Sequence, residues 1–309
     1  MRVLQVGFGS IGRRHNEILK DFEEIESIDL VSRQNIDLEG KRFSSIHDIE
    51  TFDPYDYIVI ANETSKHYDT LEHVVNHVNG KRILVEKPLF CRNRSLDIHD
   101  NRVFVAYNLR FHPIIEALRT ILENKKILYV NILTGQYLPT WRPGTDYRDS
   151  YSASLQKGGG VLRDLSHELD YAAFLFGDIV TFSSINDKIS NLEISSDDIF
   201  TAIGRTERGT ILNITMDYLS KTPLRRIVVH TDEMTVEANL VESSLRIYDE
   251  RGTSETIVKE TARNDTYRKM HEAIIRGDAE NLCTYNEGIK TMELIEKAGD
   301  YVRKDTYDQ

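Results

Sequence analysis

The feature that most constrains the fold is a glycine cluster close to the start of the chain. A mainly apolar run at residues 3–6 meets Gly7, Gly9 and Gly12, which have G-x-G-x-x-G spacing. In a strand-turn-helix context, the first glycine permits a tight turn, the second lets the backbone approach a pyrophosphate, and the third allows close packing of helix and strand. The helix N-terminus then presents free N–H groups to the phosphates.

This context predicts that the loop binds a dinucleotide. The alternative interpretation is a glycine-rich turn without a ligand. The residues expected to contact the dinucleotide are Gly7, Gly9, Ser10, Ile11 and Gly12.

Strand-like and helix-like segments alternate up to about residue 110. Strands are expected at residues 3–6, 25–33, 55–62, 81–88 and 102–108, with helices at 13–22 and 67–78. Such alternation is typical of a parallel, doubly wound α/β sheet. We therefore predict an N-terminal Rossmann-type dinucleotide-binding domain over residues 1–112.

The pattern changes after an expected helix that begins near Pro113. Strand-like stretches with alternating apolar and polar residues follow, interrupted by one helix over residues 162–177, and a helical region closes the chain at 266–298. The alternation is typical of an antiparallel sheet with one face solvated or used for association. We predict that residues 113–309 form a second α/β domain with a mostly antiparallel open sheet, which binds the substrate and serves oligomerisation.

Charge and hydropathy exclude several function classes. The chain has 50 Asp and Glu residues against 39 Lys and Arg, a net charge of -11, so we expect no nucleic-acid partner. No apolar run approaches the roughly 20 residues of a membrane span, and no signal peptide is evident, which predicts a cytoplasmic protein without membrane contact. His73 and His77 have helical spacing but no third ligand in view, so no metal site is expected.

The end of the second strand bears on the choice of cofactor. An NAD site usually has Asp or Glu about 20 residues beyond the glycine loop, whereas this chain has Ser32 and Arg33. An arginine pairs well with a 2′-phosphate, and this favours NADP(H) over NAD(H). The alternative is that Arg33 is solvated while Asp37 or Glu39 binds the ribose. Arg13 and Arg14, at the start of the helix, either neutralise phosphates or are exposed.

An ordered series of motifs resembles the Gfo/Idh/MocA oxidoreductases over essentially the whole chain. Glu86-Lys87-Pro88 follows the glycine loop by about 75 residues. Further matches follow in order: Tyr107-Asn108, Arg110-Phe111 with Pro113, then WRP, DYR and GGGVLRDLSHELDY. The resemblance implies a hydride transfer between a nicotinamide cofactor and a carbinol or ketone carbon of a sugar, sugar nucleotide or related polyol. It also implies a homodimer or homotetramer.

The same resemblance implies that Lys87, Asp164 and His167 are catalytic, and that Glu86 and Lys87 contact the cofactor. Oxidation of an alcohol carbon requires removal of the hydroxyl proton, which suits histidine near neutral pH, and a lysine stabilises negative charge on the same oxygen. Many relatives place the histidine four residues after the aspartate, whereas this chain places it three after. This departure leaves open which of Asp164 and His167 transfers the proton; His167 as a structural histidine and Asp164 as a salt-bridge partner are the alternatives.

Aromatic and cationic residues are candidates for substrate contacts. Aromatic faces stack on sugars or bases, and arginines bind phosphate or carboxylate, so an anionic or nucleotide-activated sugar is expected. The candidates are Tyr107, Asn108, Arg110, Trp141, Arg142, Tyr147 and Arg148, with loop packing or solvation as the alternative. The rival functions are a non-catalytic dinucleotide-binding sensor and an enzyme that keeps its cofactor through an oxidation and reduction cycle.

Overall fold

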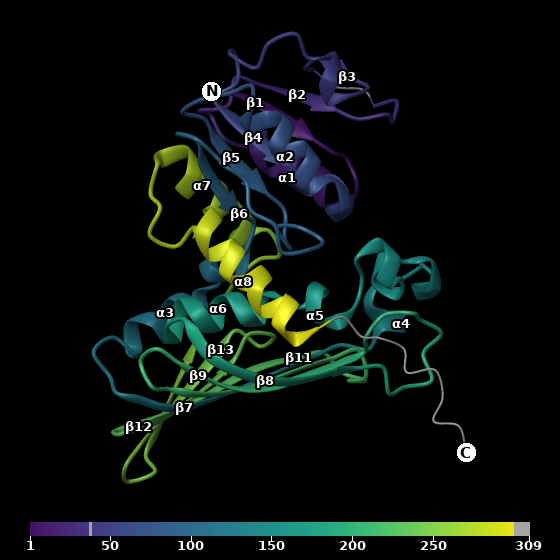
Figure 1. Cartoon of the computed structure of the whole chain (residues 1–309). Coiled ribbons are helices and arrows are strands. Elements are labelled where there is room, and N and C mark those ends of the chain that lie inside the picture. The colour runs from purple at the N-terminus through teal and green to yellow at the C-terminus, as the bar shows by residue number, and fades with distance from the viewer. Residues whose placement is uncertain (37–38, 300–309) are drawn as a thin grey trace. The chain divides into compact units, whose positions relative to one another are not determined.

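A computed structural model describes residues 1–36 and 39–299 of the chain, which forms two compact units (Figure 1). The first unit comprises Met1–Phe111 and Ala262–Met292, and the second comprises His112–Thr261 and the chain from Glu293 on. The segment 262–292 therefore returns to the N-terminal unit. The expected domain limits of 1–112 and 113–309 stay a prediction.

The first unit is built on a seven-stranded sheet in the order β15-β6-β5-β4-β1-β2-β3, and all its pairs are parallel except that of β15 with β6. The strands are β1 (Arg2–Val6), β2 (Ser27–Val31), β3 (Arg42–Phe43), β4 (Tyr57–Ile60), β5 (Arg82–Val85), β6 (Arg102–Val105) and β15 (Cys283–Thr284). The order reverses between β1 and β4, as in a doubly wound sheet. The predicted Rossmann-type architecture is confirmed.

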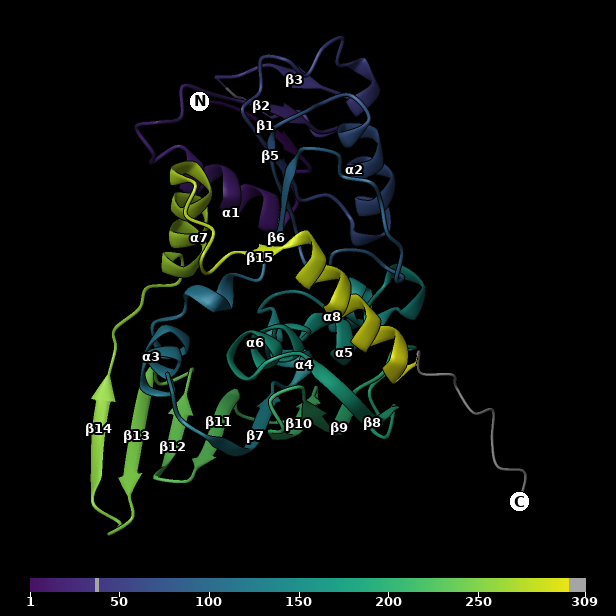
Figure 2. The same ribbon diagram turned by 60° about the vertical axis from the view of Figure 1, so that its left-hand side comes forward.

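Helices cover both faces of this sheet, which is why its central strands are buried almost throughout. Helix α1 (Ser10–Leu19) and helix α7 (Asp265–Arg276) pack side by side, while α2 (His67–Val75) lies on the opposite face (Figure 2). Met270 and Ile274 of α7 join the same apolar core as Val3 and Tyr57. Burial of this surface fixes the returning segment to the first unit.

The second unit contains an eight-stranded sheet in the order β14-β13-β12-β11-β7-β10-β9-β8, in which only β7 and β10 pair in parallel. The strands are β7 (Ile127–Gly135), β8 (Ile179–Asp187), β9 (Ile199–Thr206), β10 (Ile211–Asp217), β11 (Leu224–Thr231), β12 (Met234–Asn239), β13 (Ser244–Asp249) and β14 (Ser254–Val258). This confirms the expected mostly antiparallel sheet.

The two faces of the second sheet differ, as strand alternation requires. The inner face carries buried residues such as Ile132, Phe200 and Ile214, and helices α3 (Pro113–Ile121) and α6 (His167–Phe176) pack against the sheet (Figure 2). The outer face carries Ile185 and Ile203, which are 63% and 59% exposed. It is therefore an open, partly apolar surface.

The helix expected over residues 162–177 is divided. The chain forms α5 (Val161–Asp164) and α6, with Leu165 and Ser166 between them. Leu165 has φ -100° and ψ 23°, outside the helical region, so the helix is interrupted there. Asp164 and His167 consequently belong to two different helices.

The remaining helices are short or terminal. The final helical region contains α7, β15 and α8 (Tyr285–Ala298), and α4 spans Leu138–Trp141. Single 3-10 turns lie at Ile46–Asp48, Thr64–Lys66, Asn108–Phe111, Tyr147–Asp149, Tyr151–Ala153 and Leu155–Lys157. Within residues 1–36 and 39–299, no helix combines the length and the apolar character that crossing a membrane demands.

Candidate functional site

The glycine loop joins β1 to α1 in the way that its spacing predicts. Gly7 has φ +99°, and a Cβ there would lie 2.5 Å from the Ala61 carbonyl oxygen. A Cβ on Gly12 would lie 2.5 Å from the Gly7 carbonyl oxygen, whereas one on Gly9 would meet nothing within 4 Å. Gly7 and Gly12 are thus needed by the turn itself, and Gly9 borders open space at the N-terminus of α1.

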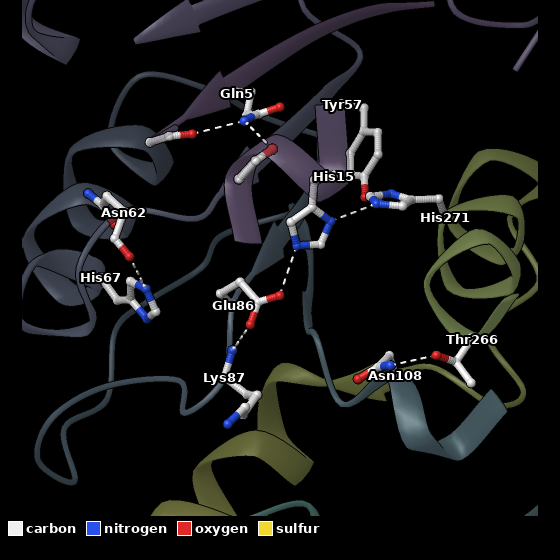
Figure 3. Close-up of polar contacts among 12 residues, drawn as sticks. Gln5, His15, Tyr57, Asn62, His67, Glu86, Lys87, Asn108, Thr266 and His271 are labelled. Carbon is white, nitrogen blue, oxygen red and sulfur yellow. Dashed lines mark hydrogen bonds and ion pairs between the residues drawn. The ribbon is translucent and has the colours of Figure 1, made fainter. Parts of the chain in front are cut away.

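A buried glutamine that the sequence analysis did not single out holds the loop. Gln5 Nε2 donates to the carbonyl oxygens of Gly7 and Gly12, both at 2.8 Å (Figure 3). Gln5 is fully buried within β1. The signal in the sequence is one amide in an otherwise apolar strand, because a buried amide needs partners.

A cavity of about 490 Å³ lies against the open side of the loop. Gln34, directly after Ser32 and Arg33, contributes to its wall, and Arg13 donates to Gln34 Oε1 at 3.1 Å. The other lining residues are Phe8, Gly9, Ser10, Arg14, Glu17, Arg263 and Asn264. Three arginines from two distant segments therefore line a cavity at a helix N-terminus, where anions are favoured.

Ser32 and Arg33 lie at the carboxyl end of β2. Ser32 Oγ accepts from the Gln34 N–H at 3.1 Å, and the Arg33 side chain is exposed. Glu39, an alternative ribose ligand, is also exposed, and Asp37 lies outside the described residues. The position of Arg33 beside Gln34 is compatible with either cofactor prediction.

Glu86 and Lys87 follow directly after β5, at the same carboxyl edge of the sheet as the glycine loop. Glu86 is buried, its Oε2 accepts from the Lys87 N–H at 3.0 Å, and its Oε1 lies 2.8 Å from His15 Nε2 (Figure 3). His67 Nδ1 lies 3.1 Å from the Pro88 carbonyl oxygen. The chain at Lys87 is therefore held by side chains from α1 and α2.

The predicted substrate residues of the first unit are all buried. Tyr107 is 1% exposed, and Asn108 Nδ2 donates to Thr266 Oγ1 at 2.6 Å. The Arg110 guanidinium donates to the Leu282 carbonyl oxygen at 3.2 Å and to Glu287 Oε1 at 2.9 Å. Asn108 and Arg110 thus bind the returning segment of the chain.

In the second unit, Asp164 forms the centre of a buried polar cluster. The Tyr218 hydroxyl donates to Asp164 Oδ2 at 2.6 Å, and burial, followed by the charge of Asp164, raises the pKa of Tyr218 well above its usual value. Asp164 and His167 are both largely buried. A tyrosine hydroxyl beside this carboxyl can share a proton with it.

Trp141 and Arg142 lie beside this cluster. The Trp141 ring packs edge-on against Tyr218 at 5.6 Å, and the Arg142 guanidinium lies 5.1 Å from the centre of the Tyr151 ring. The structure therefore brings Trp141, Arg142 and Asp164 into one neighbourhood, and their roles in a site stay a prediction.

Tyr147 and Arg148 lie in the 3-10 turn that contacts α4, and their polar groups contact the segment around Glu193. The Glu193 N–H donates to the Tyr147 hydroxyl at 3.2 Å, and Arg148 forms ion pairs with Asp146 and Glu193 at 2.6 and 2.9 Å. Arg148 also lines a cavity of about 590 Å³ together with Lys157. Its charge is already balanced by two carboxylates.

A second buried carboxyl, Asp197, packs against the glycines before α5. Its Oδ2 accepts from the Leu162 N–H at 2.9 Å, and a Cβ on Gly160 would lie 2.0 Å from its Oδ1. Burial raises the pKa of Asp197 to about 6. The sequence gives a partial signal, because paired aspartates in an apolar stretch are unusual in a core.

A known protein family matches most of the second unit. Residues 115–237 match the model of the GFO/IDH/MocA C-terminal domain. No curated protein sequence matches the chain. The resemblance to the Gfo/Idh/MocA oxidoreductases that the sequence motifs predicted is confirmed.

Several solved structures share the fold across both units. One is an oxidoreductase from Agrobacterium radiobacter in complex with NAD+, L-tartaric acid and magnesium: 17% identity, 96% of this chain and 95% of that chain covered, TM-score 0.80. UDP-N-acetylglucosamine 3-dehydrogenase GnnA from Acidithiobacillus ferrooxidans has 19% identity, 96% of both chains covered and TM-score 0.74. The WlbA dehydrogenase from Bordetella pertussis, in complex with NADH and UDP-GlcNAcA, has 19% identity, coverage of 96% and 95%, and TM-score 0.78.

Proposed function

Because residues 115–237 match the model of the GFO/IDH/MocA C-terminal domain, we propose that this chain is a nicotinamide-dependent oxidoreductase of that family and that it prefers NADP(H). Its substrate is a sugar, sugar nucleotide or related polyol with a carbinol or ketone carbon. The observation that carries the proposal is the open side of the glycine loop at Gly9, at the carboxyl edge of a doubly wound sheet.

The residues of the loop fit a dinucleotide. Gly9 is the N-cap of α1, and no side chain caps that helix end, so backbone N–H groups of the first turn are available to a pyrophosphate. The open space at Gly9 lets the phosphates approach the backbone. Gly7, Gly9, Ser10, Ile11 and Gly12 would hold the cofactor there, with Glu86 and Lys87 at the next strand ends.

The preference for NADP(H) rests on cationic side chains near the end of β2. Arg13, Arg14 and Arg263 line the cavity beside Gln34, and Arg33 precedes Gln34 in the chain. Guanidinium groups bind phosphate in a bidentate manner. A 2′-phosphate on the adenosine ribose would gain these contacts, and NADH offers no such group.

The acid and base roles are assigned to Lys87, Asp164 and His167. A bound nicotinamide cofactor supplies or accepts the hydride. Lys87 donates a hydrogen bond to the substrate oxygen and stabilises the negative charge that develops on it. His167 exchanges a proton with that oxygen, and Asp164 keeps the histidine oriented for proton transfer.

The substrate is proposed to be anionic or nucleotide-activated. Trp141 offers an aromatic face and Arg142 a guanidinium in the neighbourhood of Asp164. Two proteins of the same fold are described as a UDP-N-acetylglucosamine dehydrogenase and as a dehydrogenase in complex with UDP-GlcNAcA. The further proposed contacts are Tyr107, Asn108, Arg110, Tyr147 and Arg148.

We further propose that the chain forms a homodimer or homotetramer through the outer face of its second sheet. Ile185 and Ile203 project from this face, and so does Leu133, which is 37% exposed. Apolar side chains on an open sheet face gain stability when a second copy covers them.

The direct test of the reaction is substitution of the proposed catalytic residues. Lys87→Met and His167→Asn should each lower kcat at least about a hundredfold, because each removes a proton or charge contact with the reacting oxygen. NADPH affinity, measured by fluorescence titration, should stay within about threefold of the wild type. Near-normal turnover of both variants would refute the catalytic assignment.

A further inference from the structure

Four buried polar side chains of the first unit form an unbroken row of hydrogen bonds. Tyr57 Oη lies 2.9 Å from His271 Nδ1, His271 Nε2 lies 2.8 Å from His15 Nδ1, and His15 Nε2 lies 2.8 Å from Glu86 Oε1 (Figure 3). The row links β4, α7, α1 and the residue that follows β5.

Burial makes each of these contacts obligatory. Tyr57, His15 and His271 are fully buried, and Glu86 is 6% exposed. A buried ring nitrogen that loses its partner leaves a polar group without water or protein to satisfy it. The row therefore has few alternative arrangements.

The acidic end of the row sets the direction of its first hydrogen bond. An ionised carboxylate only accepts, and Glu86 already accepts from the Lys87 N–H, so His15 Nε2 must donate to Oε1. We assign His15 Nδ1 as the acceptor from His271 Nε2, which gives His15 one donor and one acceptor, as in a neutral imidazole. His271 Nδ1 then accepts from the Tyr57 hydroxyl.

The surroundings favour a neutral His271 and a protonated Tyr57. Burial and the neighbouring His15 lower the pKa of His271 well below its usual value, and burial raises the pKa of Tyr57. Tyr267 packs edge-on against His15 at 5.5 Å, and the Arg14 guanidinium lies 5.3 Å from the centre of the Tyr267 ring. Burial, followed by the charge of Glu86, also raises the pKa of Tyr267, so this ring is a neutral neighbour.

We propose that His15 and His271 are positioning residues, which with Tyr57 hold the Glu86 carboxylate in one orientation and thereby fix the backbone at Lys87. The consequence for the reaction rests on the proposed function of Lys87. Helix α1 begins at the glycine loop, so the row connects the loop with the proposed cofactor contacts at Glu86 and Lys87. Helix α7 of the returning segment supplies the central member.

The test is nuclear magnetic resonance of the 15N-labelled full chain, without cofactor. His15 and His271 should both be protonated at Nε2 and unprotonated at Nδ1, which the 15N shifts of the two ring nitrogens report. In His271→Leu, His15 Nδ1 loses its hydrogen-bond partner, so the 15N shift of His15 Nδ1 should move. The Lys87 amide resonance should shift in the same variant, because Glu86 can rotate.

Kinetics separate positioning from simple stabilisation. His271→Leu should lower kcat about tenfold and change the Kd for NADPH less than about threefold. His271→Gln keeps a donor toward His15 and should restore most of kcat. Ile274→Ala is the matched control: Ile274 is buried one turn further along α7, so its truncation lowers stability and should leave the His15 spectrum and kcat unchanged.

Two results would overturn the proposal. One is a wild-type His15 that is protonated at Nδ1. The other is an equal loss of kcat in Ile274→Ala and His271→Leu. The spectra require neither cofactor nor substrate, so they test the row independently of the reaction. If the expected tautomers are found and the protein turns over no sugar, the proposed reaction is refuted, while the direction of the hydrogen bonds in the row stands.

Discussion

At the residue scale, the glycines of the loop differ in how much a substitution would destabilise the fold. Gly7 needs a positive φ and has the Ala61 carbonyl against it, while Gly9 faces open space. The spacing of the glycines in the sequence was sufficient to predict this loop. The contact of His15 with His271 was not predictable, because one sequence does not show which residues 256 positions apart meet.

The two glycines give a matched pair of variants. Gly7→Ala should lower the free energy of unfolding by more than about 2 kcal/mol, because the new Cβ overlaps backbone atoms. Gly9→Ala should change it by less than about 1 kcal/mol and yet weaken NADPH binding about tenfold, because the methyl group enters the space proposed for the pyrophosphate. Urea denaturation and fluorescence titration measure the two effects, and unchanged binding in Gly9→Ala would contradict the proposed site.

Asp197 predicts a pH dependence of stability. Its pKa is 3.8 as an ordinary side chain and about 6 in the folded protein, so the folded state holds a proton that the unfolded state has released. This group therefore stabilises the protein at low pH, and the contribution is lost as the pH rises through about 6. Between about pH 5 and 7 the loss is about 1 kcal/mol.

The conservative variant tests this linkage. Asp197→Asn does not titrate and should lack this part of the pH dependence when urea denaturation is compared at the two pH values. An identical pH dependence in the variant and the wild type would show that Asp197 is not the group responsible.

At the element scale, apolar periodicity predicted the five long strands of the first sheet and the helices α1 and α2. The two-residue strands β3 and β15 are too short to produce a pattern. The region containing α7 was expected to be helical, but its return to the first unit depends on contacts of Met270 and Ile274 with strands more than 200 residues away. The interruption at Leu165 was also missed, since its residues favour a continuous helix.

The returning segment is held by the buried guanidinium of Arg110. Arg110 is 2% exposed, and its partner Glu287 has a lowered pKa because Arg110 and Thr284 outweigh the opposing effect of burial. Arg110→Met would leave this carboxylate unpaired. The expected loss is about 2 kcal/mol, at the low end for a broken buried pair because the Glu287 side chain is 38% exposed.

Arg276→Met is the control, since Arg276 pairs with Glu272 on the surface of α7 and should contribute less than about 0.5 kcal/mol. Thermal unfolding of both variants measures the difference. A rise in KM for Arg110→Met without a loss of stability would instead favour the substrate contact that the sequence predicted.

At the scale of the whole molecule, sequence motifs from the glycine loop to the GGG segment predicted a resemblance that the match of residues 115–237 to the GFO/IDH/MocA C-terminal domain bears out. The sequence predicted the type of both sheets. Continuously apolar strands are typical of a parallel sheet that is buried on both faces, and alternating strands of an antiparallel sheet with one exposed face. The sequence favoured NADP(H) through Arg33 alone. It did not show that arginines of separate segments line one cavity.

Calorimetric titration of the cofactor-stripped protein with NADPH and with NADH tests the central claim most directly. We expect NADPH to bind at least about tenfold more tightly, because only its 2′-phosphate pairs with arginine near the end of β2. Arg33→Ala should weaken NADPH binding much more than NADH binding. Tighter binding of NADH would contradict the proposed preference, and failure of both nucleotides to bind would contradict the proposed oxidoreductase function itself.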